Sequence, residues 1–252
     1  DVNATGEFRV GVDDTDSVNE DATVTQSSGA SLLVADDTDA DGNTLTVSQI
    51  AKTGGSNSAV SSGSTYNSSG TQVTGTYGQL TVGADGSYTY VANQSAADTL
   101  DAGDTVTDSF TYTVTDGTNT DTATLVITVT GVNDDPVAAD DTGAVNEDAT
   151  LTVSTASSGV VQDNDTDPDG YDTAASLVVN AIEPFGGSSS NVPPGTTYAN
   201  GTSVTGTYGT ITIGADGTYT YTADQSAADA LDSGDTVTDV FTYLVIDSSN
   251  AF

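Results

Sequence analysis

Several residue types that carry much of protein chemistry are missing from this chain of 252 residues. It contains no cysteine, histidine, methionine or tryptophan, and Arg9 and Lys52 are its only basic residues. Disulfide bonds, zinc fingers and thiol chemistry are therefore excluded, as are the Ser-His-Asp and Cys-His arrangements of nucleophilic enzymes. Paired carboxylates could still hydrolyse glycosides, but such sites usually need aromatic platforms in an apolar cleft. The composition predicts a protein that is not an enzyme.

The scarcity of basic residues leaves a very acidic chain, with 37 Asp and Glu residues and a formal net charge of −35. Nucleic acids and anionic membranes are bound through clustered Lys or Arg, so neither is an expected partner. No run of 18 apolar residues is present, and direct membrane insertion is therefore not expected. The charge should instead attract cations, and the preference for Asp over Glu suggests carboxylates placed in loops.

The chain does contain an internal repeat. Residues 71–116 and 202–247 differ at only 12 of 46 aligned positions, and VNEDATVT at 18–25 returns as VNEDATLT at 145–152. The period of about 130 residues is too long for a solenoid unit and fits one β domain per repeat. The expected organisation is an incoming strand or linker at 1–12, a first repeat at 13–131, an acidic linker at 132–139 and a second repeat at 140–252.

The apolar residues within each repeat follow the period of two that is typical of half-buried strands. Phe110, Tyr112 and Val114 alternate with threonines, and the pattern returns at Phe241 and Tyr243. Short Gly-Ala-Asp-Gly segments at 83–86 and 214–217 are typical of hairpin turns. One helical turn is expected, at 94–104. About seven short strands per repeat predict an all-β fold of tandem β-sandwich domains.

Each repeat also carries one dense acidic loop, DDTDADG at 36–42 and DNDTDPDG at 163–170. Asp on alternate residues places several oxygens in a tight turn, and calcium accepts six to eight such oxygens in irregular geometry. Each close pair of carboxylates costs about 1 kcal/mol even in water, a repulsion that a bound ion relieves. An EF-hand is excluded because no Glu stands at the twelfth loop position. The alternative is a set of solvated turns, which Asp also favours.

Three segments carry a resemblance to a known family: VADDTDADGNTLTV (34–47), YGQLTVGADGSYTYVANQSAADTLDAGDTVTDSFTYTVTDG (77–117) and VTGVNDDPVAADD (129–141). They resemble VCBS repeats, the cadherin-like modules of very large bacterial surface and secreted proteins, and the resemblance covers nearly all of residues 12–252. It implies tandem immunoglobulin/cadherin-like β-sandwich domains. It also implies export to the bacterial cell surface or medium and a role in cell adhesion and biofilm formation.

The similarity to cadherins implies Ca²⁺ ligands by position. The linker resembles the cadherin D-x-N-D-N segment, although Gly131 replaces its first Asp and Asp135 its second Asn. The D-x-D pairs of the acidic loops, the Glu of each first strand and, with a different spacing, the segment LDAGD match further cadherin ligands. The implied metal ligands are Glu20, Asp39, Asp41, Asp101, Asp104, Asn133, Asp134, Asp135, Glu147, Asp167 and Asp169. One inter-repeat site would gather the ligands of the first repeat's end, the linker and the second acidic loop.

Two functions are consistent with these features. The first is the calcium-rigidified stalk of a bacterial surface adhesin, with neighbouring repeats of the same or an identical chain as partners and a surface glycan or another cell as a further partner. The alternative is a structural subunit of an extracellular filament or sheath. It rests on the second repeat stopping at Phe252, before a counterpart of 121–131, and on the spare alternating segment 4–12. Donor-strand complementation would use both features.

Overall fold

The computed structural model describes residues 9–27, 32–33, 37–40, 42–249 and 252. They belong to two units, Asp1–Val132 and Asn133–Phe252, each of which is described by itself. Almost all regular structure is β, and the single helical segment in the described ranges is a short 3-10 turn at Ala156–Ser158. Within those ranges, no helix is long and apolar enough to cross a membrane.

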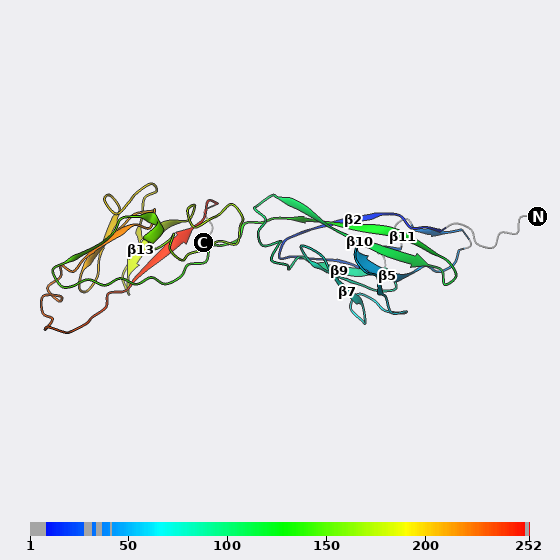
Figure 1. Cartoon of the computed structure of the whole chain (residues 1–252), viewed down its shortest axis with the longest axis horizontal. Helices are drawn as coiled ribbons and strands as arrows, with labels where there is room; N and C mark the ends of the chain where they lie inside the picture. The colour runs from blue at the N-terminus through cyan, green and yellow to red at the C-terminus, as the bar shows by residue number, and fades with distance from the viewer. Residues whose placement is uncertain (1–8, 28–31, 34–36, 41, 250–251) are drawn as a thin grey trace, which may run out of the picture. The chain divides into compact units, whose positions relative to one another are not determined.

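The first unit consists of two main sheets and a small strand pair. One sheet has the strand order β2-β11-β10-β5-β6 and the other the order β3-β9-β8-β7, while β1 pairs with β4. Figure 1 labels β2, β11, β10 and β5 of the first sheet and β9 and β7 of the second. Pairing is antiparallel except between β2 and β11, which run parallel. The strand bounds are β1 Arg9–Val10, β2 Asp14–Asn19, β3 Thr23–Gln26, β4 Thr38–Asp39, β5 Thr46–Lys52, β6 Ser58–Ala59, β7 Thr71–Thr74, β8 Gln79–Val82, β9 Tyr88–Val91, β10 Thr105–Thr115 and β11 Thr120–Thr130.

The core of the first unit lies between its two main sheets. β10 and β11 are paired along all of their residues, and each turns every second side chain inward. Phe110, Tyr112, Leu125 and Ile127 are completely buried, and Tyr90 meets Phe110 edge-on from the opposite sheet at 6.1 Å. The threonines between them face outward, so the predicted alternation of core and solvent faces is confirmed.

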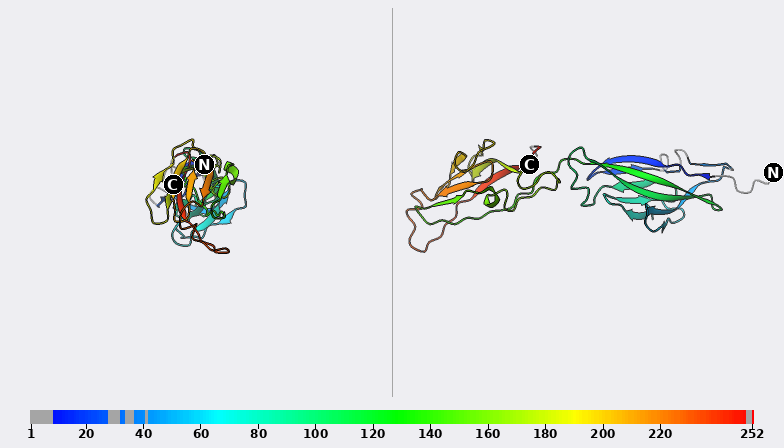
Figure 2. Two further views of the ribbon diagram at one scale, coloured as in Figure 1. Left: turned by 90° about the vertical axis from the view of Figure 1, so that its left-hand side faces the viewer. Right: turned by 45° about the horizontal axis from the view of Figure 1, so that its top comes forward.

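The second unit has the same plan with fewer strands. Its sheets have the orders β14-β13-β18 and β12-β17-β16-β15. Their bounds are β12 Thr150–Val153, β13 Val178–Pro184, β14 Ser190–Asn191, β15 Thr202–Thr205, β16 Thr210–Ile213, β17 Tyr219–Thr222 and β18 Phe241–Ile246. β13 (yellow) and β18 (red) lie side by side in Figure 2, and residues 232–240 ahead of β18 run as a loop.

The predicted hairpins are present in both repeats. β8 and β9 are antiparallel neighbours around a turn in which Gly86 has a φ of +79°, and β16 and β17 are joined in the same way around Gly217. The helical turn expected at 94–104 is instead a series of three reverse turns, closed by hydrogen bonds from Ala97 N to Gln94 O, from Leu100 N to Ala97 O and from Asp104 N to Asp101 O. The predicted all-β sandwich fold is confirmed.

Candidate metal centre

The linker of the second unit lies along that unit's acidic loop. Val137 and Thr166 exchange two backbone hydrogen bonds of 2.7 and 3.0 Å. On either side of this bridge, Ala139 N donates to Asp165 Oδ1 at 2.7 Å, and Asp134 N donates to Asp169 Oδ2 at 3.1 Å. The backbone of residues 134–139 is therefore fixed by carboxylates of the loop that follows it in sequence.

Three carboxylates converge where the linker, the acidic loop and the end of β18 meet. Asp167, Asp172 and Asp247 each present one oxygen within 4.8 Å of the others. Asp172 and Asp247 are only 7% and 3% exposed, and Asp167 is partly buried. Asn133 joins this cluster by donating from Nδ2 to Asp247 Oδ2 at 2.6 Å. Asp169, also buried, donates its backbone N–H to Asp167 Oδ1 at 2.9 Å.

Neutral donors around the cluster hold its carboxylates in place. Ser176 Oγ donates to Asp172 Oδ1 at 3.1 Å, and Ser248 Oγ donates to Asp172 Oδ2 at 3.0 Å. Ser249 N donates to Asp247 Oδ1 at 2.8 Å. Such outer hydrogen bonds fix the orientation of ligating groups and leave their remaining lone pairs available to an ion.

The electrostatics of the cluster favour a bound cation. The segment 133–252 contains no lysine or arginine to neutralise the acids. Burial raises the pKa of Asp167 from 3.8 to about 6, and the nearby charges of Asp169, Asp172 and Asp247 add to this shift. Asp167 Oδ2 is buried without a hydrogen bond. A buried carboxylate oxygen lacking a donor is costly unless a cation compensates it, and this all-oxygen set fits a hard divalent ion such as calcium.

In the absence of calcium, lowering the pH from about 7 to about 4 should raise the melting temperature of the second unit. The pKa of Asp167 is higher in the folded state, so the folded chain binds more protons than the unfolded chain between pH 3.8 and about 6. The corresponding stability is fully present below pH 3.8 and is lost as the pH rises through about 6. Burial shifts the pKa values of Asp141 and Asp165 in the same direction.

Calorimetry in chelator across this pH range measures the effect directly. Asp167→Asn is the matched variant, in which the pH dependence should become weaker because one titrating group is removed. A second-unit transition that moves to lower temperature as the pH falls to 4 would contradict the assignment.

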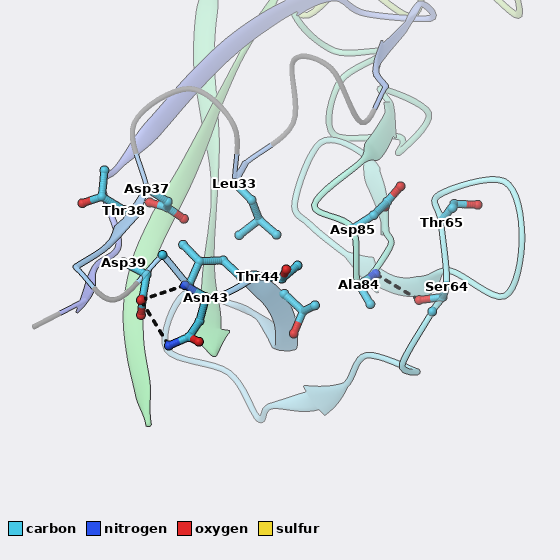
Figure 3. Close-up of a pocket in the computed structure, with 14 residues that line it drawn as sticks. Leu33, Asp37, Thr38, Asp39, Asn43, Thr44, Ser64, Thr65, Ala84 and Asp85 are labelled. Atoms are coloured by element: carbon cyan, nitrogen blue, oxygen red, sulfur yellow. Dashed lines mark hydrogen bonds between the residues drawn. The ribbon is translucent and has the colours of Figure 1, made fainter. Parts of the chain in front are cut away.

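The acidic loop of the first unit has a different arrangement. Asp39 Oδ1 accepts hydrogen bonds from Asn43 N at 3.1 Å and from Asn43 Nδ2 at 3.3 Å, beside a pocket of about 640 Å³ (Figure 3). Asp37, the counterpart of Asp165, accepts a hydrogen bond from Val12 N at 2.7 Å. The loop is shorter than its second copy and has no counterpart of Asp172. Asp41 lies outside the described residues.

The predicted ligands at the other end of the first unit lie around its last strand. Glu20 is 2% exposed and accepts a hydrogen bond from Val132 N, directly after β11. The turn that contains Asp101 and Asp104 pairs with Gly131 through backbone hydrogen bonds of 2.9 and 3.0 Å. All three predicted ligands of this end are thus placed around residues 130–132.

The structure brings together some of the predicted ligands of the second unit and adds two others. Asn133, Asp134, Asp167 and Asp169 belong to the cluster region, whereas Asp135 and Glu147 are exposed. That ligands from both repeats share one site stays a prediction. Sequence reasoning missed Asp172 and Asp247. Asp247 follows the strand FTYLVI as Asp116 follows FTYTVT, a shared position that could have indicated it. Asp172 stands just beyond the acidic loop in a segment with no equivalent in the first repeat.

Comparisons with known proteins agree with this architecture. The bacterial cadherin-like domain family matches residues 10–131 and again residues 133–252, and the chain belongs to this family. It is similar to the calcium-binding lectin RapA2 of Rhizobium johnstonii, with 29% identity over 182 residues that cover 71% of this chain and 69% of that protein.

Two solved structures of a family 107 endo-fucoidan hydrolase, one of them a variant, cover 94% of this chain at 15% and 16% identity. This chain spans 28% of their length, and the TM-score is 0.28 for both. A likeness of this size carries no argument about fold or activity.

Proposed function

We propose that this chain is a non-catalytic, calcium-binding repeat module of an extracellular bacterial surface protein, in which calcium stiffens the connection between successive repeats. The observation that carries the proposal is the convergence of Asp167, Asp172 and Asp247 within 4.8 Å in a unit with no basic residue. A bound calcium ion would neutralise these carboxylates and supply the positive charge that the chain lacks.

The chemistry of the site supports calcium over other divalent ions. All available metal ligands are carboxylate, amide or backbone oxygens. Softer metals prefer nitrogen and sulfur ligands, so this set does not favour them. The carboxylates come from separate segments and form an irregular group, which calcium tolerates better than magnesium does. Membership of the cadherin-like family and similarity to a protein named a calcium-binding lectin support the same ion.

The anchoring of adjacent residues supports a mechanical role. Val132 donates its N–H to Glu20 of the first unit, and Asn133 donates from its side chain to Asp247 of the second. The two anchored residues are neighbours in sequence, so few backbone torsions separate one anchor from the other. Ordering Asn133 and Asp134 through the acidic cluster would restrict those torsions. Without an ion, repulsion among the carboxylates would work against that order.

Calcium titration by calorimetry, paired with small-angle scattering of the whole chain, tests the proposal. We expect saturable binding with a dissociation constant of about 10⁻⁴–10⁻³ M, as in other extracellular calcium modules, and a larger maximum dimension in calcium than in chelator. Chelation should also lower the melting temperature, because the ion binds the folded state alone.

Magnesium at matched ionic strength is the control for nonspecific screening of the −35 charge. Binding without extension would contradict the stiffening and reduce the ion to a local support of the second unit. An absence of binding at millimolar calcium would contradict the proposed function as a whole.

A further inference from the structure

One buried carboxylate of the second unit takes no part in the cluster of Asp167, Asp172 and Asp247. Asp165 is only 1% exposed, although it belongs to the same acidic loop. Its Oδ1 accepts the N–H of Ala139 at 2.7 Å, whereas its Oδ2 is buried without a hydrogen bond. An oxygen in that position is costly unless a donor, a proton or a cation compensates it. The second unit has no lysine or arginine, so a compensating cation has to come from solution.

The phenol of Tyr243 is surrounded by more acceptor oxygens than it can serve. Its Oη lies 2.8 Å from Asp141 Oδ2 and 2.9 Å from Ala139 O. Val160 O and Asp165 Oδ1 follow at 3.3 and 3.5 Å. One O–H group carries a single hydrogen, so it can donate a full hydrogen bond to only one of these four oxygens. Burial and the hydrogen bond to Asp141 raise the pKa of Tyr243, and the phenol therefore keeps that hydrogen at neutral pH.

Two carboxylates and two backbone carbonyls around one hydrogen are a suitable ligand set for a hard divalent cation. Calcium accepts carboxylate and carbonyl oxygens together with water, and it tolerates irregular geometry. The charges of Asp141 and Asp165 would balance that of the ion, whereas without it they repel each other. Asp141 is only partly buried and Asp140 beside it is exposed, so water can reach this side of the group and complete the coordination.

The first unit contains the same arrangement with a difference in burial. Tyr112 Oη donates to Asp14 Oδ2 at 2.7 Å and lies 2.9 Å from Val12 O. Val12 N donates in turn to Asp37 Oδ1 at 2.7 Å, as Ala139 N does to the acid of the second loop. The arrangement therefore belongs to the fold of the repeat. Asp37 is only partly buried, so the second unit has the stronger need for a compensating charge.

This group of oxygens lies at the other end of the linker from the candidate metal centre. The backbone bridge between Val137 and Thr166 separates the two in the acidic loop. Asp165 binds the backbone at residue 139, whereas Asp169 binds it at residue 134. The cluster of three carboxylates contains neither Asp165 nor Asp141. An ion at each place would hold both ends of the segment 134–139 against the acidic loop.

We propose that the second unit binds a further calcium ion through the carboxylates of Asp141 and Asp165, with the backbone carbonyls of Ala139 and Val160 as additional ligands. The inference rests on the calcium function proposed above and adds an ion whose ligands all belong to the second unit. Tyr243 keeps Asp141 in place through its hydrogen bond. The ion fixes residues 139–141, where the chain leaves the linker and enters the second repeat.

Calcium titration of the whole chain by calorimetry tests the site by counting ions. Asp165→Asn should lose one ion or bind it at least about tenfold more weakly, because ligand charge sets much of the affinity. The amide keeps an oxygen for Ala139 N, and Asp141→Asn, at a partly buried position, is a second variant that should lose the same ion. Asp229→Asn, an equal charge change at an exposed site, should bind calcium as the natural sequence does. Full binding at natural affinity by both Asp165→Asn and Asp141→Asn would overturn the proposal and leave a proton as the compensating charge.

A variant with both Asp172→Asn and Asp247→Asn separates this site from the candidate metal centre. We expect it to retain an ion that is lost when Asp165→Asn is added. Terbium, a hard ion that replaces calcium, gives a second readout. The chain has no tryptophan, so emission sensitised by the protein's aromatic side chains reports an ion close to a tyrosine such as Tyr243. This emission should persist in the double variant and fall when Asp165→Asn is added.

The outcomes distinguish this inference from the proposed function. If the natural sequence bound no calcium, both would be overturned. If the natural sequence bound calcium but the double variant bound the same number of ions with and without Asp165→Asn, only the further site would be overturned.

Discussion

Replacing Asp108 by alanine should destabilise the first unit by about 3 kcal/mol, and so lower its melting temperature by roughly 10 °C. Asp108 is 1% exposed and accepts four hydrogen bonds. Three come from the backbone N–H groups of Thr76, Tyr77 and Gly78, at 2.6, 3.0 and 3.1 Å, and the fourth from Tyr90 Oη at 2.7 Å. The carboxylate thus closes the turn between β7 and β8 and ties it to β9 and β10.

The expected loss is large because the hydrogen bonds from Gly78 N and Tyr90 Oη are buried and those from Thr76 N and Tyr77 N are partly buried, so removing the acceptor leaves donors with restricted access to water. A buried N–H or O–H group without a partner costs its full desolvation energy, about 1–3 kcal/mol. The turn also approaches Asp108 very closely, since a Cβ added at Gly75 would lie 2.1 Å from Asp108 Oδ2. Asp108→Asn should retain part of the stability, because the amide has one acceptor oxygen but turns an NH₂ group towards the remaining donors.

The second repeat contains the matched control. Asp239 accepts hydrogen bonds from the backbone N–H groups of Thr207, Tyr208 and Gly209 and from Tyr221 Oη, but it is only partly buried. Asp239→Ala should therefore lower the free energy of unfolding of its unit by less than Asp108→Ala does, because water can reach the donors that lose their acceptor. Calorimetry with the two unfolding transitions assigned to their units measures both effects. Equal losses for the two variants would show that burial of the donors does not set the cost.

Much of this fold could be predicted from local sequence pattern. The alternation around Phe110 and Tyr112 and the Gly-Ala-Asp-Gly turns each specify a local structure that both repeats contain. Such signals depend on neighbouring residues only, and tertiary context did not override them. The repeat period likewise indicates two similar domains, because each copy is long enough to form a core of its own.

The strand extents of the second repeat could not be predicted in the same way. Residues 236–240 are almost identical to Thr105–Ser109, yet only the first set belongs to a strand. A strand persists where a neighbour satisfies its backbone groups, and β11 is that neighbour in the first unit. Pairing partners far away in sequence are therefore decisive for strand extent, and a local pattern contains no information about them.

The candidate metal centre could likewise be predicted only where its residues lie close together in sequence. The acidic loop and the linker were found from sequence because their Asp and Asn residues are concentrated in short segments. Asp247 was not found, because it is a single acid 80 residues beyond Asp167 that the fold brings to the cluster. Density of ligands along the chain is thus a useful signal, but convergence in space depends on the end of β18 lying beside the loop.

Asp167→Asn should change the stability of the second unit in opposite directions with and without calcium. In chelator, the variant should melt at a higher temperature than the natural sequence. Asp167 has its pKa raised to about 6 by burial and by the charges of Asp169, Asp172 and Asp247, so its ionised form is disfavoured in the folded unit at pH 7. An amide of the same shape removes this repulsion and can donate to the carboxylates that remain.

In calcium well above the dissociation constant, the same variant should melt at a lower temperature than the natural sequence. An amide offers an ion one neutral oxygen where the carboxylate offered a charged pair, and affinity should fall by at least about tenfold because ligand charge sets much of it. The stabilisation that calcium binding gives the folded unit then falls by RT times the logarithm of the fold-loss in affinity. Asp167 Oδ2, buried without a hydrogen bond, is the atom through which this loss is expected to act.

The control is Asp229→Asn, an equal charge change at an exposed site away from the acidic loop. It should leave calcium affinity within about twofold and shift the melting temperature little in either condition, because surface charges contribute weakly. If Asp167→Asn and Asp229→Asn behaved alike in calcium, the effect would be one of net charge, and the cluster would not be a metal centre. An inversion of sign confined to Asp167→Asn cannot come from packing alone, since the same side chain would have to both stabilise and destabilise one fold. It requires an ion that binds where the carboxylates repel each other.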